Sequence, residues 1–417
     1  MNPFKLETKD VNEYVMDMKK MYPKAYNKKQ TSPYTKTRII LLNGTEFEST
    51  WFMHQFARNC DNDEIKRELA VVRAQEQMQQ KRLACLKPIN ESILETTIAY
   101  EQLAIDLTAT LAQNEKDKEV KKALDFALLE DFDHLYRFAN LLSIDKNEDA
   151  APLVGKFTEI TPGRPTIAHH RYPKDNIKNP MNSKKADLYT KLVASTITAA
   201  EQQTMNYYMN IAQWYKNDLG RKLYAEIGMV EEEHVSQYES LKDPTCTWLE
   251  QWVLHEYCEC YLYYSAMQEE KDAYIRSIFE DHFYMEVSHL HKATELLKKH
   301  EGTEYKKVLG TDGEFPKLLT LGTNKEYVRD ILERTISLTG NRDDYIDVYN
   351  LPSDADFFNY QRLVIPSEND VPSHLVIEKA IDKLGKDYRY EDKKNPVKEL
   401  QDRKSDNTTI GRNNKSK

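Results

Sequence analysis

An internal repeat limits most strongly how this chain can fold. Shifting the sequence by 155 residues aligns residues 46–142 with 201–297 without a gap, and 20 of the 97 aligned positions are identical. Asn62 meets Asn217 in this alignment, as expected where the N-caps of equivalent helices coincide. The repeat predicts a duplicated unit of four helices.

The composition favours helices over sheets, because the 417 residues include only 12 glycines. We therefore expect an all-α protein of four-helix bundles built from duplicated helical hairpins, with a loop-rich C-terminal extension. Apolar side chains recur at helical spacing in eight segments. The predicted helices cover about 46–60, 64–87, 91–113, 118–142, 187–216, 219–241, 247–268 and 272–299.

These segments divide the chain into six regions. They are an N-terminal extension (1–45), a first four-helix repeat (46–142), a long crossover connection (143–186), a second four-helix repeat (187–300), a loop-rich extension with one short helix (301–385) and a polar tail expected to be disordered (386–417). We expect the short helix within residues 318–340, and residues 347–366 read as a loop.

Acidic residues and histidines recur in three of the predicted hairpins with one fixed spacing. In each, a single Glu precedes an acidic residue by 30 positions, and a His follows three positions later. The three sets are Glu101, Asp131 and His134; Glu201, Glu231 and His234; and Glu256, Glu286 and His289. Since both helices of a hairpin rise about 1.5 Å per residue, this spacing brings each Glu opposite its partner pair.

A single Glu and a Glu-x-x-His pair from each of two hairpins are the ligands that a dinuclear metal centre requires. The chain resembles the ferritin-like di-iron carboxylate superfamily, which includes rubrerythrins, ferritins and the small subunit of ribonucleotide reductase. The resemblance is carried by Glu101, Asp131, His134 and the 201–234 hairpin, and it includes the crossover. It implies two iron or manganese ions per site and no catalytic residues beyond the metal ligands.

Two positions depart from the superfamily pattern. Asp131 stands where the superfamily has Glu, so Glu130 is an alternative ligand. The first hairpin keeps Glu46 and Glu76 but has Gln79 in the place of His234, which predicts a poor metal half-site.

The pairing of the hairpins is also open. The crossover favours a primary site between the 101–134 and 201–234 hairpins. In the alternative, Glu101, Asp131 and His134 face the 256–289 hairpin, and a second centre becomes available. Of the remaining side chains near these motifs, we expect Glu232 and Glu233 on a solvated face.

A hard, mostly oxygen site suits iron or manganese and reaction with dioxygen or hydrogen peroxide. We therefore expect an oxidoreductase of the oxidase or peroxidase type, with a separate electron donor since no C-x-x-C motif is present. Iron binding and sequestration, or hydroxylation of an organic substrate by a di-iron site, are the alternatives. A structural helical protein that has lost its metal sites is a further alternative.

The net charge of −9 disfavours nucleic acid as a partner. No segment has the roughly 18 consecutive apolar residues of a membrane span, and the N-terminus lacks the apolar stretch of a signal peptide. We expect a cytoplasmic protein without a membrane partner, and the sequence leaves its oligomeric state open.

Overall fold

The structure is a computed structural model that describes residues 1–161, 170–386 and 397–400. Helices make up most of it, as the composition predicted, so the all-α class is confirmed. The α-helices are α1 Pro33–Arg58, α2 Asp63–Ala84, α3 Ile93–Asn114, α4 Lys118–Lys146, α5 Ala151–Val154, α6 Leu188–Trp214, α7 Asp218–Ser240, α8 Trp248–Glu269, α9 Ala273–Glu301, α10 Tyr305–Leu309, α11 Lys325–Thr335, α12 Asp356–Val364 and α13 Pro372–Leu384.

The second helix of each hairpin begins at a side-chain N-cap. The side chain of Asn62 accepts hydrogen bonds from backbone N–H groups at the start of α2, and Asp117, Asn217 and Asp272 cap α4, α7 and α9 in the same way. Each cap satisfies N–H groups that the helix leaves unpaired. The aligned positions therefore have the same structural role, while the duplication itself stays a prediction.

The first helix is longer than the sequence suggested. It begins at Pro33, after the N-cap Ser32, rather than at about residue 46. Proline at the first helical position has a fixed φ suited to the helix and lacks an N–H that would be unpaired there. The N-terminal extension thus ends before residue 33, and α1 gains about three turns over the prediction.

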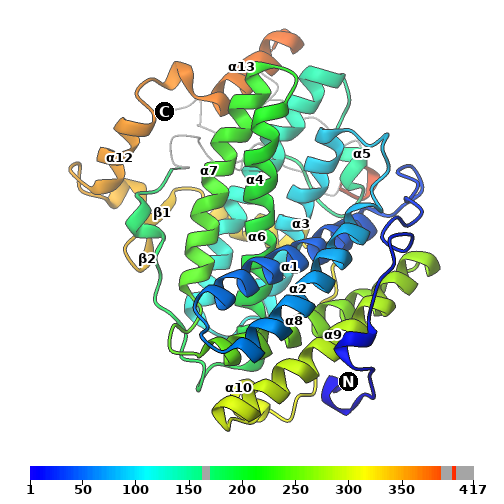
Figure 1. The fold of residues 1–417 in the computed structure, drawn as a ribbon. Coiled ribbons are helices and arrows are strands. Elements are labelled where there is room, and N and C mark those ends of the chain that lie inside the picture. The colour runs from blue at the N-terminus through cyan, green and yellow to red at the C-terminus, as the bar shows by residue number, and fades with distance from the viewer. Residues whose placement is uncertain (162–169, 387–396, 401–417) are drawn as a thin grey trace.

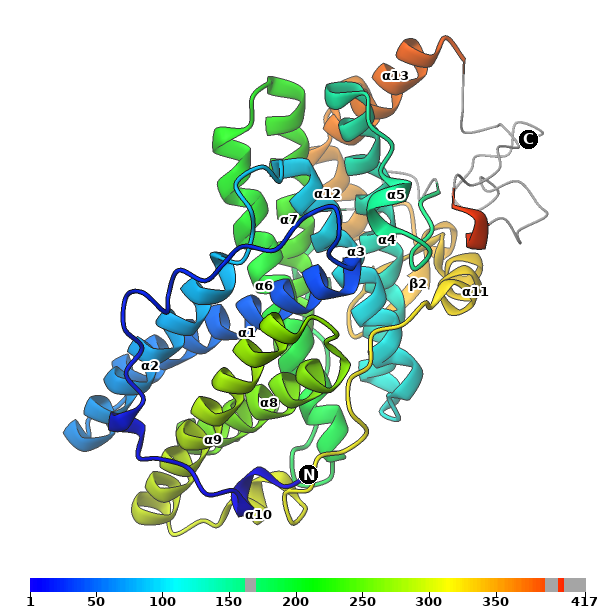
Figure 2. The ribbon, with the colours of Figure 1, turned by 90° about the vertical axis from the view of Figure 1, so that its right-hand side faces the viewer.

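The long helices form four hairpins: α1 with α2, α3 with α4, α6 with α7, and α8 with α9. The second hairpin pairs with the third, and the first with the fourth. Helix α3 packs against α6, and α4 against α7; likewise α1 packs against α8, and α2 against α9. We call α3, α4, α6 and α7 the central group, and α1, α2, α8 and α9 the flanking group. In Figure 1, α4 and α7 run nearly upright while α1 and α2 cross at an incline, and Figure 2 shows α1 and α2 beside α8 and α9.

Each group combines one hairpin from each half of the chain. The predicted four-helix repeats at 46–142 and 187–300 concern the order of helices along the sequence, and they stay a prediction. Two equivalent contacts hold the hairpins together. Thr190 Oγ1 donates a hydrogen bond to Glu115 Oε1 (2.6 Å), and Thr35 Oγ1 donates one to Glu270 Oε1 (3.0 Å). Thr35 aligns with Thr190 and Glu115 with Glu270 in the repeat.

Each group has an apolar core. Trp252, Tyr263 and Phe279 are fully buried in the flanking group, and Phe138 and Tyr224 in the central group. Burial of such aromatic side chains contributes a large share of the hydrophobic free energy of folding. The polar residues of the predicted metal sites therefore lie inside apolar surroundings.

The region after residue 301 has more structure than expected. Besides α11, which lies within the predicted 318–340 segment, it contains α10, α12 and α13, and an antiparallel hairpin of β1 Leu338–Asn341 and β2 Asp344–Asp347. Helix α12 lies in residues 347–366, which the sequence predicted to be a loop. Its Phe357 is buried, and this burial outweighs the weak helical pattern of the segment. The predicted tail falls outside the described residues, except for residues 386 and 397–400.

Helix α13 packs against α4 and α7 of the central group, and α11 against α3 and α4. The C-terminal region thus covers the helices that carry the first two sets of acidic residues and histidines. In the part of the chain that the structure describes, no helix combines the length and apolar character that crossing a membrane requires.

Candidate metal centres

The central group brings together all six residues of the predicted primary site. Ligand atoms of Asp131, Glu201, Glu231 and His234 lie within 4.8 Å of one another, and so do those of Glu101, His134 and Glu231. All six side chains are 0–1% exposed. Because Glu231 belongs to both sets, the cluster has two adjoining candidate positions for cations. We call it the central cluster.

Glu231 lies between the two imidazoles. Its Oε1 atom is 2.9 Å from His134 Nδ1, and its Oε2 atom is 3.2 Å from His234 Nδ1. The same His234 nitrogen lies 3.4 Å from Asp131 Oδ1 and 3.6 Å from Glu201 Oε2. His234 therefore turns its Nδ1 atom towards three carboxylates.

Glu130 contacts the other side of the His234 ring and thus has a different role from Asp131. Its Oε2 atom lies 2.8 Å from His234 Nε2 and also accepts a hydrogen bond from the guanidinium of Arg171. A carboxylate on the outer nitrogen of a metal-binding histidine fixes the tautomer and orientation of the ring. The structure favours Asp131 over Glu130 as the ligand at this position.

Arg171 is a buried residue of the crossover that the sequence did not single out. Its backbone N–H lies 3.2 Å from both carboxylate oxygens of Glu233, and its Nε donates to Asn176 Oδ1 at 2.6 Å. Glu233 is 6% exposed. The expected solvated position of Glu233 is therefore wrong, because the crossover folds over this face of α7; Glu232 is half-buried.

A buried tyrosine also reaches the cluster. The hydroxyl of Tyr208 donates a hydrogen bond to Glu101 Oε1, and Tyr208 is fully buried. Burial and the charge of Glu101 raise the pKa of Tyr208 well above its usual value. The phenol therefore stays protonated and acts as a donor that holds Glu101.

Without a cation the central cluster must share protons. Burial raises the pKa of Glu201 to about 7, although His234 opposes this effect, and burial with the charge of Glu201 raises the pKa of Asp131 well above its usual value. Burial acts in the same direction on Glu231, but His134 and His234 outweigh it and lower its pKa to about 2. Buried carboxylates that repel one another in this way favour binding of protons or cations.

The flanking group contains a second cluster. Ligand atoms of Glu76, Glu256, Glu286 and His289 lie within 4.8 Å of one another, as do those of Glu46, Glu76 and Glu259. We call these six residues the flanking cluster; all are 0–1% exposed. Glu76 belongs to both sets, and it is the residue that aligns with Glu231 in the repeat.

His289 is oriented towards the carboxylates of this cluster. Its Nδ1 atom lies 3.0 Å from Glu76 Oε1 and 3.1 Å from Glu286 Oε2, while its Nε2 atom lies 2.7 Å from Gln75 Oε1. Gln75 thus contacts the outer nitrogen of His289, as Glu130 contacts that of His234. Both histidines are held from outside by a polar side chain.

The structure settles the open pairing of the hairpins. Glu101, Asp131 and His134 lie with Glu201, Glu231 and His234, so the alternative in which they face the 256–289 hairpin is wrong. Glu256, Glu286 and His289 instead lie with Glu46 and Glu76 of the first hairpin, which the sequence predicted to be a poor metal half-site. The reason is that α8 and α9 pack on α1 and α2, across the length of the chain.

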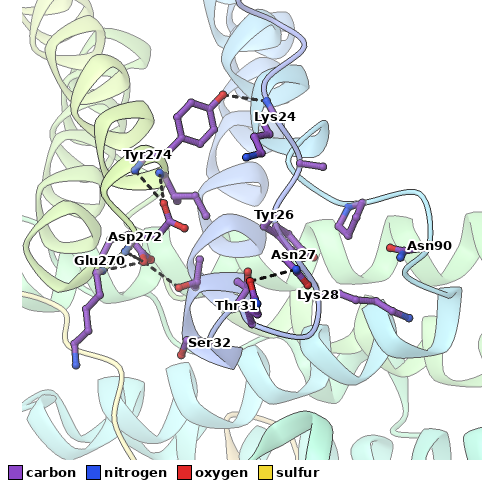
Figure 3. Close-up of a pocket in the computed structure, with 16 residues that line it drawn as sticks. Lys24, Tyr26, Asn27, Lys28, Thr31, Ser32, Asn90, Glu270, Asp272 and Tyr274 are labelled. Carbon is purple, nitrogen blue, oxygen red and sulfur yellow. Dashed lines mark hydrogen bonds between the residues drawn. The ribbon is translucent and has the colours of Figure 1, made fainter.

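A surface pocket of about 940 Å³ lies apart from both clusters, between the segment before α1 and the turn from α8 to α9 (Figure 3). Lys24, Lys28, Glu270 and Asp272 are among its lining residues, and no residue of either cluster lines it. Its acids already have partners, since Glu270 accepts from Thr35 and Asp272 caps α9. The pocket is therefore no part of either cluster.

Comparison with known protein families, curated proteins and solved structures found no match.

Proposed function

We propose that the central cluster is a dinuclear iron or manganese site of the ferritin-like type, and that the protein is an oxidoreductase reacting with dioxygen or hydrogen peroxide. The position of Glu231 carries the proposal, because one of its oxygens faces His134 and the other faces His234. A carboxylate that presents one oxygen to each of two histidine-containing positions is suited to bridge two metal ions.

The donor set fits this pair of ions. Four carboxylates balance the charge of two divalent cations, and the two imidazoles add neutral ligands. Iron or manganese bound there would supply reversible one-electron oxidation steps. The chain contributes orientation: Glu130 holds the ring of His234, and the hydroxyl of Tyr208 holds Glu101.

Burial supports a small oxidant over a large organic substrate. Every ligand side chain of the central cluster is 0–1% exposed, so only small molecules reach it without rearrangement of the helices. Dioxygen and hydrogen peroxide meet this condition. Electrons would come from a separate carrier protein.

Metal analysis of the anaerobically purified protein tests the proposal. Its iron and manganese content and absorption spectrum, before and after addition of peroxide, are compared with those of the His134→Ala/His234→Ala variant. We expect the variant to lose about two ions per chain and the spectral response to peroxide. Equal metal content and equal spectra in both proteins would overturn the proposal.

A further inference from the structure

We infer that the flanking cluster is a second metal centre with two chemically unequal cation positions that share Glu76. The first position contains His289 and suits a divalent transition ion. The second consists of the carboxylates of Glu46, Glu76 and Glu259 alone, and suits a hard cation such as Mg²⁺ or Mn²⁺. This inference does not rest on any reaction at the central cluster.

Glu259 is the observation that points to a ligand. It is 1% exposed, and neither of its carboxylate oxygens has a hydrogen-bond partner among the described residues. It lies three residues after Glu256 on α8, so both side chains project from one face of the helix. A buried carboxylate without donors is costly, and a bound cation removes that cost.

Gln79 explains why the second position needs another carboxylate. It aligns with His234, so the second position lacks an imidazole. Its Nε2 atom instead donates hydrogen bonds to Glu46 Oε1 (3.2 Å) and to Glu286 Oε1. Glu259 aligns with Ala104, which has no ligand atom. The flanking cluster thus has an additional carboxylate where the central cluster has an additional histidine.

The charge of the two clusters differs accordingly. The central cluster has four carboxylates and two imidazoles, whereas the flanking cluster has five carboxylates and one imidazole. Two divalent cations balance the first set and leave one negative charge on the second. A more anionic, oxygen-rich position prefers hard cations and binds soft ones less selectively.

Counting Mn²⁺ in a chain whose central cluster is disabled tests the inference. The full chain carrying His134→Ala/His234→Ala is stripped with a chelator, loaded with Mn²⁺ without oxygen, passed through a desalting column and analysed for metal. We expect about two ions per chain, about one after the further change Glu259→Gln, and about two after Glu48→Gln. Glu48 is the matched control, because it is a buried acid of α1 outside the cluster. Its Oε2 atom lies 3.2 Å from His255 Nε2.

A gain-of-ligand variant covers the case in which Glu259→Gln does not fold. In the same background, Gln79→His supplies the missing imidazole. We expect excess Mg²⁺ to displace about one Mn²⁺ from the background chain but not from the Gln79→His chain, as followed by the paramagnetic resonance of released Mn²⁺. Equal displacement in both chains overturns the inference.

The two proposals fail separately. If the central cluster binds no metal, the His134→Ala/His234→Ala chain holds as many ions as the unaltered chain, and the Glu259→Gln comparison stays valid. If the disabled chain holds no Mn²⁺, or if Glu259→Gln leaves the count unchanged, the flanking cluster is not the centre inferred here.

Discussion

The Nε2 atom of His234 lies 2.8 Å from Oε2 of Glu130, and the same carboxylate accepts a hydrogen bond from Arg171. Arg171 belongs to the crossover, Glu130 to α4 and His234 to α7, so this chain of contacts links three separate parts of the sequence. It links the crossover to a candidate metal ligand, because Glu130 sets which ring nitrogen of His234 faces the cluster.

Removing either outer partner should weaken metal binding without removing a ligand. We expect Glu130→Gln or Arg171→Met to lower the affinity of the central cluster for Mn²⁺ by roughly 10–100-fold, since the ring of His234 loses its fixed orientation. Competition with a chelator of known affinity measures the change. Arg38→Met is the control, because Arg38 is also buried and pairs with Glu270 (2.9 Å) in the flanking group; a comparable loss there would argue for a general effect on folding.

The three consecutive glutamates of α7 should differ in their effect on metal content. Glu231→Ala is expected to remove metal from the central cluster, because Glu231 faces both imidazoles. Glu232→Ala should leave the metal in place, since Glu232 is outside the central cluster and its side chain accepts a hydrogen bond from Ser236, on the same helix. Elemental analysis of the purified variants distinguishes them. An equal loss of metal from both would contradict the assignment of Glu231 as a metal ligand.

Glu233→Gln should behave differently from both neighbours. Its carboxylate contacts the backbone N–H of Arg171 and lies 3.6 Å from the Arg171 guanidinium. We expect the variant to retain metal but to unfold at lower temperature, because the crossover loses a charged partner inside the protein. Thermal unfolding followed by circular dichroism measures the shift; an unchanged unfolding temperature would contradict this role.

The buried threonine contacts between hairpins should contribute to stability. Thr190→Val removes the hydroxyl that donates to Glu115 and should lower the free energy of unfolding by about 1–3 kcal/mol, because a buried carboxylate loses a donor. Thr198→Val is the matched control on α6, as its hydroxyl donates a hydrogen bond to the backbone carbonyl of Ala194 on the same helix. Denaturation of the two variants in urea compares them, and an equal loss would show that the contact between hairpins adds nothing.

Asp106 should make stability depend on pH. Burial raises the pKa of this carboxyl from 3.8 to about 8, although a hydrogen bond from Thr158 opposes the shift. The folded protein therefore holds a proton that the unfolded chain releases, and the stability contributed by Asp106 falls as pH rises from about 4 to about 8. Asp106→Asn cannot lose that proton, so the variant should become more stable relative to the unaltered chain as pH rises through this range.

The difference in unfolding temperature between the two chains, measured at several pH values, isolates this effect from other titrating groups. A difference that stays constant from pH 4 to 9 would rule out a neutral carboxyl at Asp106 in the folded protein.

The sequence by itself determined the helices and the spacing of the acids and histidines. Helical periodicity and N-caps such as Asn62 and Asp272 are local, so the positions of seven of the eight long helices were predicted to within a few residues. The spacing of Glu201, Glu231 and His234 within one hairpin is likewise set by the rise of an α-helix.

Only the tertiary structure decided which hairpins pair, because helices far apart in sequence meet through the shapes of their apolar faces, which no local pattern records. That pairing placed Glu46 and Glu259 in one cluster and gave Glu130, Arg171 and Glu233 their buried contacts. Glu259 could have been noticed as a second acid on the face of α8 that carries Glu256. Arg171 had no local signal, because its acidic partners Glu130 and Glu233 come from helices that the crossover reaches only in the folded chain.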